Sequence, residues 1–141
     1  MSDDRDVWAG DGERYEGDDR PCRTVTSRRD LTLDDYQREA TRTAVYPGHG
    51  EAMGLAYVCL GLAGEASEIA NKAKKVLRDA GGELDDERRD ALAHELGDVL
   101  WYVAAVASEL GVPLGALGAG NLSKLADRAA RGAIKGDGDR R

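Results

Sequence analysis

The apolar residues of this chain are mostly Ala and Leu and gather in long runs, whereas Val and Ile never alternate with polar residues as they would in strands. Short Gly- and Pro-containing breaks divide the region from 31 to 131 into segments of helical length. The pattern predicts an all-α fold that resembles a four-helix bundle. Helices are predicted at residues 33–45, 51–79, 85–110 and 114–131.

Capping residues support these boundaries. Thr32, with Asp35 three positions later, forms a capping-box pattern at the first helix. Pro47 and the glycines of YPGHGE end this helix, and AGG at 80–82 ends the second. Asp85 is placed to cap the third helix. Because the AGG break is short, the second and third helices are predicted to be antiparallel neighbours.

The predicted domain covers residues 31–135 and is flanked by polar segments. Residues 1–30 are rich in Asp, Arg and Gly and poor in aliphatic side chains, so they bury too little apolar surface to offset the entropy of ordering. We expect a flexible charged leader there and a polar, Gly-rich tail at residues 136–141.

Charge and cysteine content narrow the function classes. Asp and Glu number 27 against 20 for Lys and Arg, which gives a net charge of -7 and disfavours nucleic acid as a partner. Cys22 and Cys59 lie in no recognisable motif, as is typical of a reduced, cytoplasmic protein. No charge-free apolar run approaches the ~18 residues of a membrane span, and the start lacks the apolar segment of a signal peptide. We expect a cytoplasmic protein with no membrane partner.

Two pairs of acids stand inside the predicted helix pair. Glu65 and Glu68 are three residues apart, as are Glu95 and Asp98, so each pair lies on one helical face. Glu65 and Asp98 have the same sequence midpoint as Glu68 and Glu95, and that midpoint lies inside the AGG break. The two acid pairs are therefore predicted to lie opposite one another in the hairpin. Four like charges in a partly dry cleft would cost on the order of several kcal/mol. The pattern therefore predicts a bound cation, and all-oxygen ligands favour Mg²⁺, with Mn²⁺ as a substitute.

A solvated acidic face, with Lys72 and Lys75 as salt-bridge partners, is the alternative interpretation. One pair of acids at this spacing is common in helices. Two such pairs placed symmetrically about one interhelical break are less common. His94 points about 100° away from its neighbour Glu95 on a helix. Ala91 stands three residues before it, so the Glu-x-x-His pattern of di-iron bundles is absent. We expect His94 to be a core or surface residue.

The last predicted helix carries groups suited to phosphate. Asn121, Lys124 and Arg128 share one helical face and offer an amide, a compact charge and a planar fork. Taken alone, this face is more simply explained as a solvated basic stripe. Lys72 shares the face of Glu68 one turn on, and both bridging phosphate and tuning the carboxylates are open roles for it.

Groups that would contact a base are harder to identify. Trp101 and Tyr102 are able to stack on a base, although aromatic residues at such helix positions usually pack in the core. His49, in the YPGHGE loop, is a candidate contact to base or phosphate, but an ordinary loop histidine is the simpler interpretation. The sequence leaves the substrate base open.

Together these motifs resemble a known family. The order E-x-x-E, break, E-x-x-D resembles the MazG-like nucleoside triphosphate pyrophosphohydrolases of the all-α NTP pyrophosphatase superfamily. The segments LTLDDYQREATRTAVYPG, LGLAGEASEIANKAKKVLRD, ELGDVLWYVAAVASELG and NLSKLADRAARG also resemble its small single-domain members, and cover roughly residues 31–139. The resemblance implies Mg²⁺-dependent cleavage of a nucleoside triphosphate between its α and β phosphates, in nucleotide-pool housecleaning. Monophosphate and pyrophosphate would be the products.

The resemblance also implies residue roles. The metal ligands would be Glu65, Glu68, Glu95 and Asp98. Lys124 and Arg128 resemble the family's phosphate-contacting residues, and Asn121 stands where a substrate-contacting Asn is expected. Glu68 is the candidate general base, although the sequence does not decide this. Family members form dimers or tetramers with sites near subunit interfaces, so we expect a homodimer or homotetramer.

Three alternatives stay open at this point. A dUTP- or dCTP-specific all-α pyrophosphatase would use similar acids. A nucleotide sensor would bind the triphosphate without turning it over. A non-catalytic helical interaction module would keep the acids as a salt-bridged surface and would gain no thermal stability from Mg²⁺.

Overall fold

The computed structural model describes residues 31–132; the expected leader at 1–30 and tail at 136–141 lie outside the described residues. Within the described range all regular secondary structure is α-helical, which confirms the all-α fold class. Its helices are α1 (Leu33–Thr41), α2 (Ala52–Ala80), α3 (Asp86–Glu109) and α4 (Leu114–Ala130). No single described helix is long and apolar enough to cross a membrane, and α3 with α4 meets the length and composition criteria only as a bent pair.

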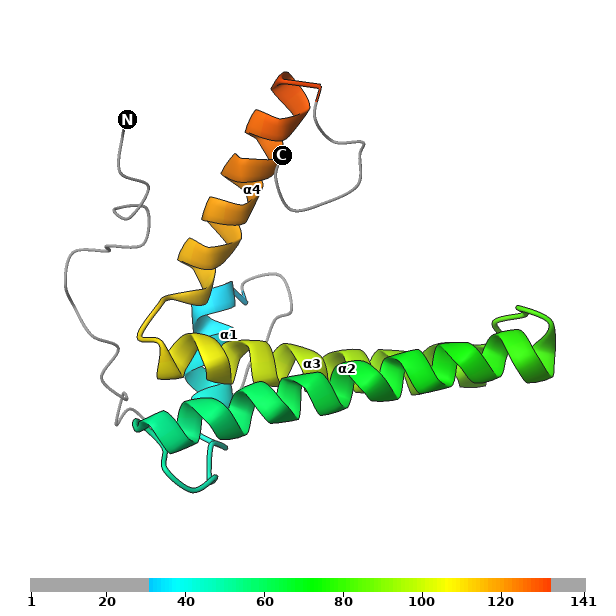
Figure 1. Cartoon of the computed structure of the whole chain (residues 1–141), viewed down its shortest axis with the longest axis horizontal. Coiled ribbons are helices and arrows are strands. Elements are labelled where there is room, and N and C mark those ends of the chain that lie inside the picture. Colours follow the sequence, from blue (N-terminus) through cyan, green and yellow to red (C-terminus); the bar gives the residue numbers. More distant parts are fainter. Residues whose placement is uncertain (1–30, 133–141) are drawn as a thin grey trace.

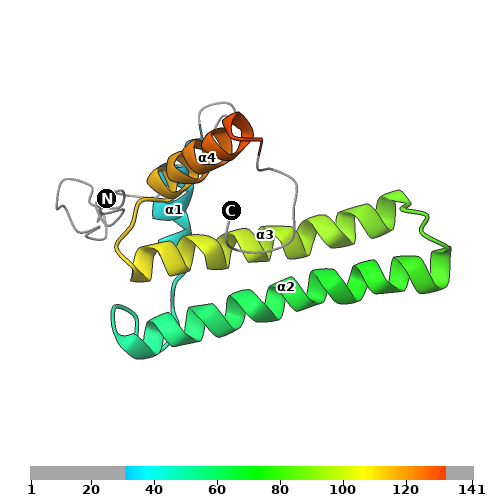
Figure 2. The ribbon, with the colours of Figure 1, turned by 45° about the horizontal axis from the view of Figure 1, so that its top comes forward.

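Helices α2 and α3 form a long antiparallel hairpin and lie side by side in both views (Figure 1, Figure 2). Gly81 ends α2 in the left-handed region, with φ of 60°, and its N–H donates to the carbonyl of Val76. Asp85 then caps α3, because its carboxylate accepts a hydrogen bond from the N–H of Arg88 at 2.9 Å. The break and the cap therefore lie where the sequence places them and set the register of the hairpin.

Helix α1 crosses one end of this hairpin and packs against α3 (Figure 2). The predicted capping box is present at its start. The N–H of Asp35 donates to Oγ1 of Thr32 at 3.0 Å, and the N–H of Thr32 donates to the carboxylate of Asp35 at 3.4 Å.

The end of α1 corrects the predicted boundary at residue 45, because the helix ends at Thr41. Thr43 explains the difference: its N–H and its hydroxyl both donate to the carbonyl of Ala40, at 3.0 and 2.8 Å. Trp101 then donates its Nε1–H to Oγ1 of Thr43 at 2.7 Å. These side-chain bonds replace continued helix, as threonine hydroxyls commonly do.

Helix α4 turns away from the hairpin, and α3 and α4 are bent relative to each other by 101° (Figure 1). Side chains of α1 hold this turn. Fully buried Gln37 donates to the carbonyl of Val112 at 3.0 Å and accepts from the N–H of Leu114 at 2.7 Å. Asp34 accepts from the N–H of Gly115 at 2.7 Å. The bundle-like arrangement is therefore open on the α4 side in a single chain.

The hydrophobic core is small and lies where α1, α3 and α4 meet. It consists of Ala40, Ala104, Ala107 and Leu114, with Tyr36, Trp101, Val103 and Leu117 packed against it. Many of the large apolar side chains elsewhere are exposed, among them Leu60, Leu77, Leu96, Leu100, Leu122 and Leu125. A single chain thus leaves much of the apolar surface of its described helices uncovered.

Candidate metal centre and substrate site

Three carboxylates meet between α2 and α3. Glu65 on α2 and Glu95 and Asp98 on α3 each present one oxygen, and these oxygens lie within 4.8 Å of one another. Glu65 and Glu95 are half-buried, whereas Asp98 is exposed. The hairpin register therefore brings acids from both helical pairs together.

The proximity of these carboxylates changes the pKa of Glu65. Burial raises the pKa of its carboxyl group, and the negative charges of Asp98, Glu95 and Glu68 raise it further. A hydrogen bond with Glu95 acts in the same direction. Neighbouring carboxylates repel one another when all are ionised, so a cation bound at this cluster would stabilise the charged form.

Glu68 lies one turn along α2 from Glu65, at the edge of the cluster. It is exposed, and it stands outside the three-oxygen group formed by the described residues. Its charge is nevertheless close enough to contribute to the raised pKa of Glu65. The metal-ligand and general-base roles of Glu68 stay predictions.

Lys72 reaches across the hairpin. Its Nζ lies 3.4 Å from Oε1 of Glu95, and the two side chains are 33% and 19% exposed. The ion pair partly neutralises the carboxylate cluster from the α2 side. Of the two roles that the sequence left open, this contact favours the tuning of the carboxylates, while a direct phosphate contact stays a prediction.

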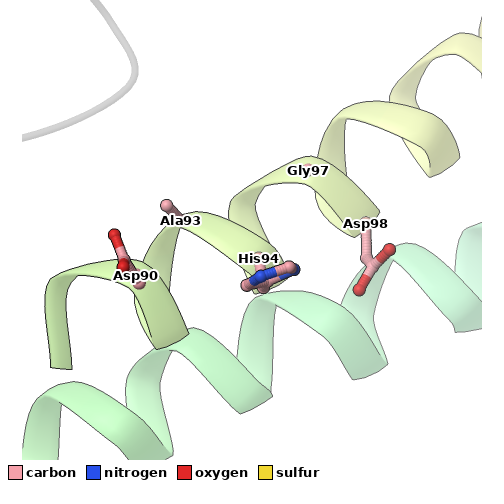
Figure 3. A pocket seen from close by; sticks show the side chains of 5 residues that line it. All are labelled: Asp90, Ala93, His94, Gly97 and Asp98. Atoms are coloured by element: carbon pink, nitrogen blue, oxygen red, sulfur yellow. The ribbon is translucent and has the colours of Figure 1, made fainter. Parts of the chain in front are cut away.

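A hollow runs along α3 beside the cluster (Figure 3). It is lined by Asp90, Ala93, His94, Gly97 and Asp98. A Cβ at Gly97 would meet nothing within 4 Å, and the exposed Asp98 lines the same hollow. His94 is exposed, in agreement with the surface role among those expected. His94 also precedes Asp98 by four residues, so the two side chains lie on the same face of α3. The direction of His94 relative to Glu95 alone does not show this relation.

The predicted phosphate-binding face lies elsewhere. Asn121 and Lys124 are exposed on α4 and Arg128 is half-buried there. Because α4 packs chiefly against α1 and turns away from the hairpin, a single chain does not bring these residues to the carboxylates. Their substrate-binding roles stay predictions.

Two aromatic residues, Tyr46 and Tyr57, were not singled out from the sequence. The rings of Tyr46 and Tyr57 are stacked, with centroids 5.5 Å apart and planes 11° apart. Trp101 meets Tyr46 and Tyr102 edge-on and packs against the core, as expected of an aromatic at its position. Tyr102 packs closely on α2 at Gly61, because a Cβ there would lie 2.1 Å from the Tyr102 ring.

Comparison with known proteins places this site in a family. Residues 55–131 match the model of the MazG nucleotide pyrophosphohydrolase domain, which is more than half of the chain. The chain belongs to the MazG family. The MazG match spans most of α2 and all of α3 and α4, and so contains the four acids, Lys72, Asn121, Lys124 and Arg128.

One relative extends the match beyond the MazG domain. The chain is 53% identical over 114 residues to the gene 37 protein of Mycobacterium phage L5, an alignment that covers 79% of this chain and 100% of the relative. The name of that relative states no activity. No solved structure matches the chain.

Proposed function

We propose that this MazG protein hydrolyses nucleoside triphosphates to a nucleoside monophosphate and pyrophosphate, with Mg²⁺ as cofactor. The observation that supports the proposal is the convergence of oxygens from Glu65, Glu95 and Asp98 within 4.8 Å inside the MazG domain. The proposed substrates are non-canonical or deoxynucleoside triphosphates of the cytoplasmic pool, and the proposed role is the removal of these nucleotides.

The donor set fits a hard divalent cation. All three groups are carboxylates, and Mg²⁺ and Mn²⁺ prefer oxygen donors of this kind. Glu68, at the edge, would complete the ligand set. The mutual repulsion that raises the pKa of Glu65 is relieved when a cation binds among these oxygens.

The groups of the chain divide the remaining work. When bound, Mg²⁺ supplies positive charge to phosphate oxygens and makes a nearby water molecule more acidic. Glu68 is exposed at the edge of the cluster, where it would accept the proton of the attacking water. Lys72 limits repulsion within the carboxylate cluster through its pair with Glu95. Lys124 and Arg128 would stabilise negative charge on the departing pyrophosphate.

The basic face of α4 would reach the carboxylates in a homo-oligomer. In one chain α4 leaves the hairpin at 101° to α3, so the acidic and basic faces stand apart. A second copy would place its α4, with Asn121, Lys124 and Arg128, over this hairpin in a homodimer or homotetramer. The exposed leucines of α2, α3 and α4 supply apolar surface of the kind that such an assembly buries.

Product analysis tests the proposal. The purified protein is incubated with a panel of ribo- and deoxynucleoside triphosphates, with Mg²⁺, with Mn²⁺ and with chelator, and the products are followed by ³¹P NMR. We expect monophosphate and pyrophosphate to form when Mg²⁺ or Mn²⁺ is present and not in chelator. Release of diphosphate and inorganic phosphate, or no turnover of any triphosphate, would contradict the proposal.

A further inference from the structure

Tyr57 presents an exposed aromatic surface near the carboxylates. It lies on α2, is 46% exposed, and its ring is parallel to that of Tyr46 at a centroid distance of 5.5 Å. One face of the Tyr57 ring is therefore partly covered by the offset ring of Tyr46, while much of the side chain reaches solvent. An aromatic ring supported in this way is a good partner for a further flat ring.

Tyr46 is held in place by Glu109, at the C-terminal end of α3. Its hydroxyl donates to Oε1 of Glu109 at 2.6 Å, and the N–H of Gly50 donates to Oε2 of the same carboxylate at 3.0 Å. Trp101 closes one side of Tyr46 edge-on at 6.3 Å, and the ring of His49 lies 5.3 Å away. Because this support is fixed before any ligand arrives, little conformational entropy is lost on binding.

Tyr102 connects this surface to the carboxylates. It stands one turn after Asp98 on α3 and lies against α2 at Gly61. Along α2, Tyr57, Gly61 and Glu65 follow one another at four-residue steps, so that the row spans roughly 12 Å by helical rise. The exposed ring and the carboxylate cluster therefore share one side of the hairpin, with Tyr102 between them.

We infer that Tyr57, supported by Tyr46, stacks on the base of the nucleoside triphosphate whose phosphates reach the carboxylate cluster. The inference rests on the proposed function and adds the place where the base binds. The separation of Tyr57 from Glu65 is comparable with the reach of a nucleotide from its base to a cation held on its phosphates. Since every base has a π-face, this surface favours nucleotides over inorganic polyphosphate and discriminates weakly among bases.

Substitution of the ring tests the inference. Tyr57→Leu and Tyr57→Gln remove it at an exposed helix position, whereas Tyr57→Phe keeps it. Because stacking on a base contributes to substrate binding, we expect KM for nucleoside triphosphates to rise about tenfold in the first two variants, with a smaller change in kcat. Tyr57→Phe should recover most of the affinity. Competitive inhibition by inorganic tripolyphosphate, which has no base, should not weaken in any of them.

Equilibrium binding separates failure of this inference from failure of the proposed function. Deoxynucleoside monophosphates are titrated in chelator and followed by intrinsic fluorescence, and Tyr57→Leu should bind them about tenfold more weakly than the wild type. Absence of turnover in the wild type would overturn the proposed function. Normal turnover in the wild type, with KM and monophosphate affinity unchanged in Tyr57→Leu and Tyr57→Gln, would overturn base stacking at Tyr57. Base stacking at Tyr57 would also be overturned if inhibition by tripolyphosphate weakened in Tyr57→Leu and Tyr57→Gln as much as nucleotide binding does.

Discussion

Glu65 is the residue on which desolvation and neighbouring charge act together. Burial first, and then the charges of Asp98, Glu95 and Glu68, raise the pKa of its carboxyl group above the ordinary value of 4.5. An acid with a higher pKa in the folded protein binds more protons when folded, so stability falls as pH rises above the pKa of the unfolded chain. In chelator the cluster therefore destabilises the protein at neutral pH, and a bound cation would offset this effect.

Replacing Glu65 with Gln removes one of the mutually repelling charges. In chelator at pH 7 we expect Glu65→Gln to melt at a higher temperature than the wild type, and the difference to shrink as the pH falls through 4.5. With Mg²⁺ the order should reverse, because the wild type alone gains the full stabilisation by metal. Thermal melts between pH 4 and 8 measure both effects. A variant less stable than the wild type at pH 7 in chelator would contradict this electrostatic account.

Glu68→Gln and Asp98→Asn distinguish the edge of the cluster from its centre. We expect each to reduce kcat by about 10² or more while circular dichroism shows unchanged helix content. Asp98→Asn should also weaken metal affinity, since Asp98 belongs to the three-oxygen group. Retained activity in both variants would remove the catalytic metal site.

Spacing reveals the acids but not the aromatic surface. Helical positions three apart share a face whatever the tertiary structure, and the short AGG break then sets the register that joins Glu65 to Asp98. The position of Tyr46 depends instead on a hydrogen bond to Glu109, 63 residues further along the chain. No local pattern reports such a contact, so the stack on Tyr57 appears in the structure alone.

Helix α1 determines the direction of α4. Its buried Gln37 and its Asp34 bind the N–H groups of Leu114 and Gly115, at the start of α4. The sequence predicted the bounds of α4 closely, because Pro113 and the helical run mark them locally. It did not predict the direction of α4, since that direction follows from long-range hydrogen bonds of α1. The amphipathic pattern of α1 also does not predict that the polar residue Gln37 is fully buried.

Gly61 and Gly64 form a matched pair for testing the α2–α3 packing. A Cβ at Gly61 would lie 2.1 Å from the ring of Tyr102, whereas one at Gly64 would meet nothing within 4 Å. Urea unfolding should show a loss of about 1–3 kcal/mol for Gly61→Ala, from overpacking. Gly64→Ala should gain about 0.5–1 kcal/mol from helix propensity. Equal effects of the two substitutions would contradict the close packing of Tyr102.

The start of α1 is sensitive to acid. Hydrogen bonds from the side chain of Thr32 and from Arg38 lower the pKa of Asp35 from 3.8 to about 2. A lowered pKa gives stability that is present above the unfolded pKa and is lost as pH falls towards the folded one. The stability difference between wild type and Asp35→Asn should therefore be constant above roughly pH 4 and vanish near pH 2, as urea unfolding at each pH would show. A difference that persists unchanged at pH 2 would rule out this role for the carboxylate.

At the scale of the molecule, the described helices have a small core and a large exposed apolar surface. Residues buried around α1, α3 and α4 are mostly alanines, while leucines of the hairpin and of α4 face outward. The sequence predicted an all-α chain from its periodicity and composition. How far the bundle closes depends on the orientation of α4, which composition does not encode.

An assembly that covers these leucines should be detectable in solution. We expect sedimentation to give a dimer or tetramer and the melting temperature to rise with protein concentration. Leu96→Glu places a charge on an exposed apolar position of α3 and should shift the protein towards monomer, with loss of activity. Lys74→Glu, at an exposed polar position of α2, is the control. A fully active wild-type monomer would contradict the oligomeric site.

The central claim is that the paired carboxylates hold a divalent cation, and calorimetric titration of Mn²⁺ and Mg²⁺ into nucleotide-free protein tests it most directly. We predict saturable binding to the wild type and at least about tenfold weaker binding to Asp98→Asn, whose helix content should be unchanged. Absence of metal binding to the wild type, or equal affinity in the variant, would contradict the claim and leave the acids as a solvated face of the hairpin.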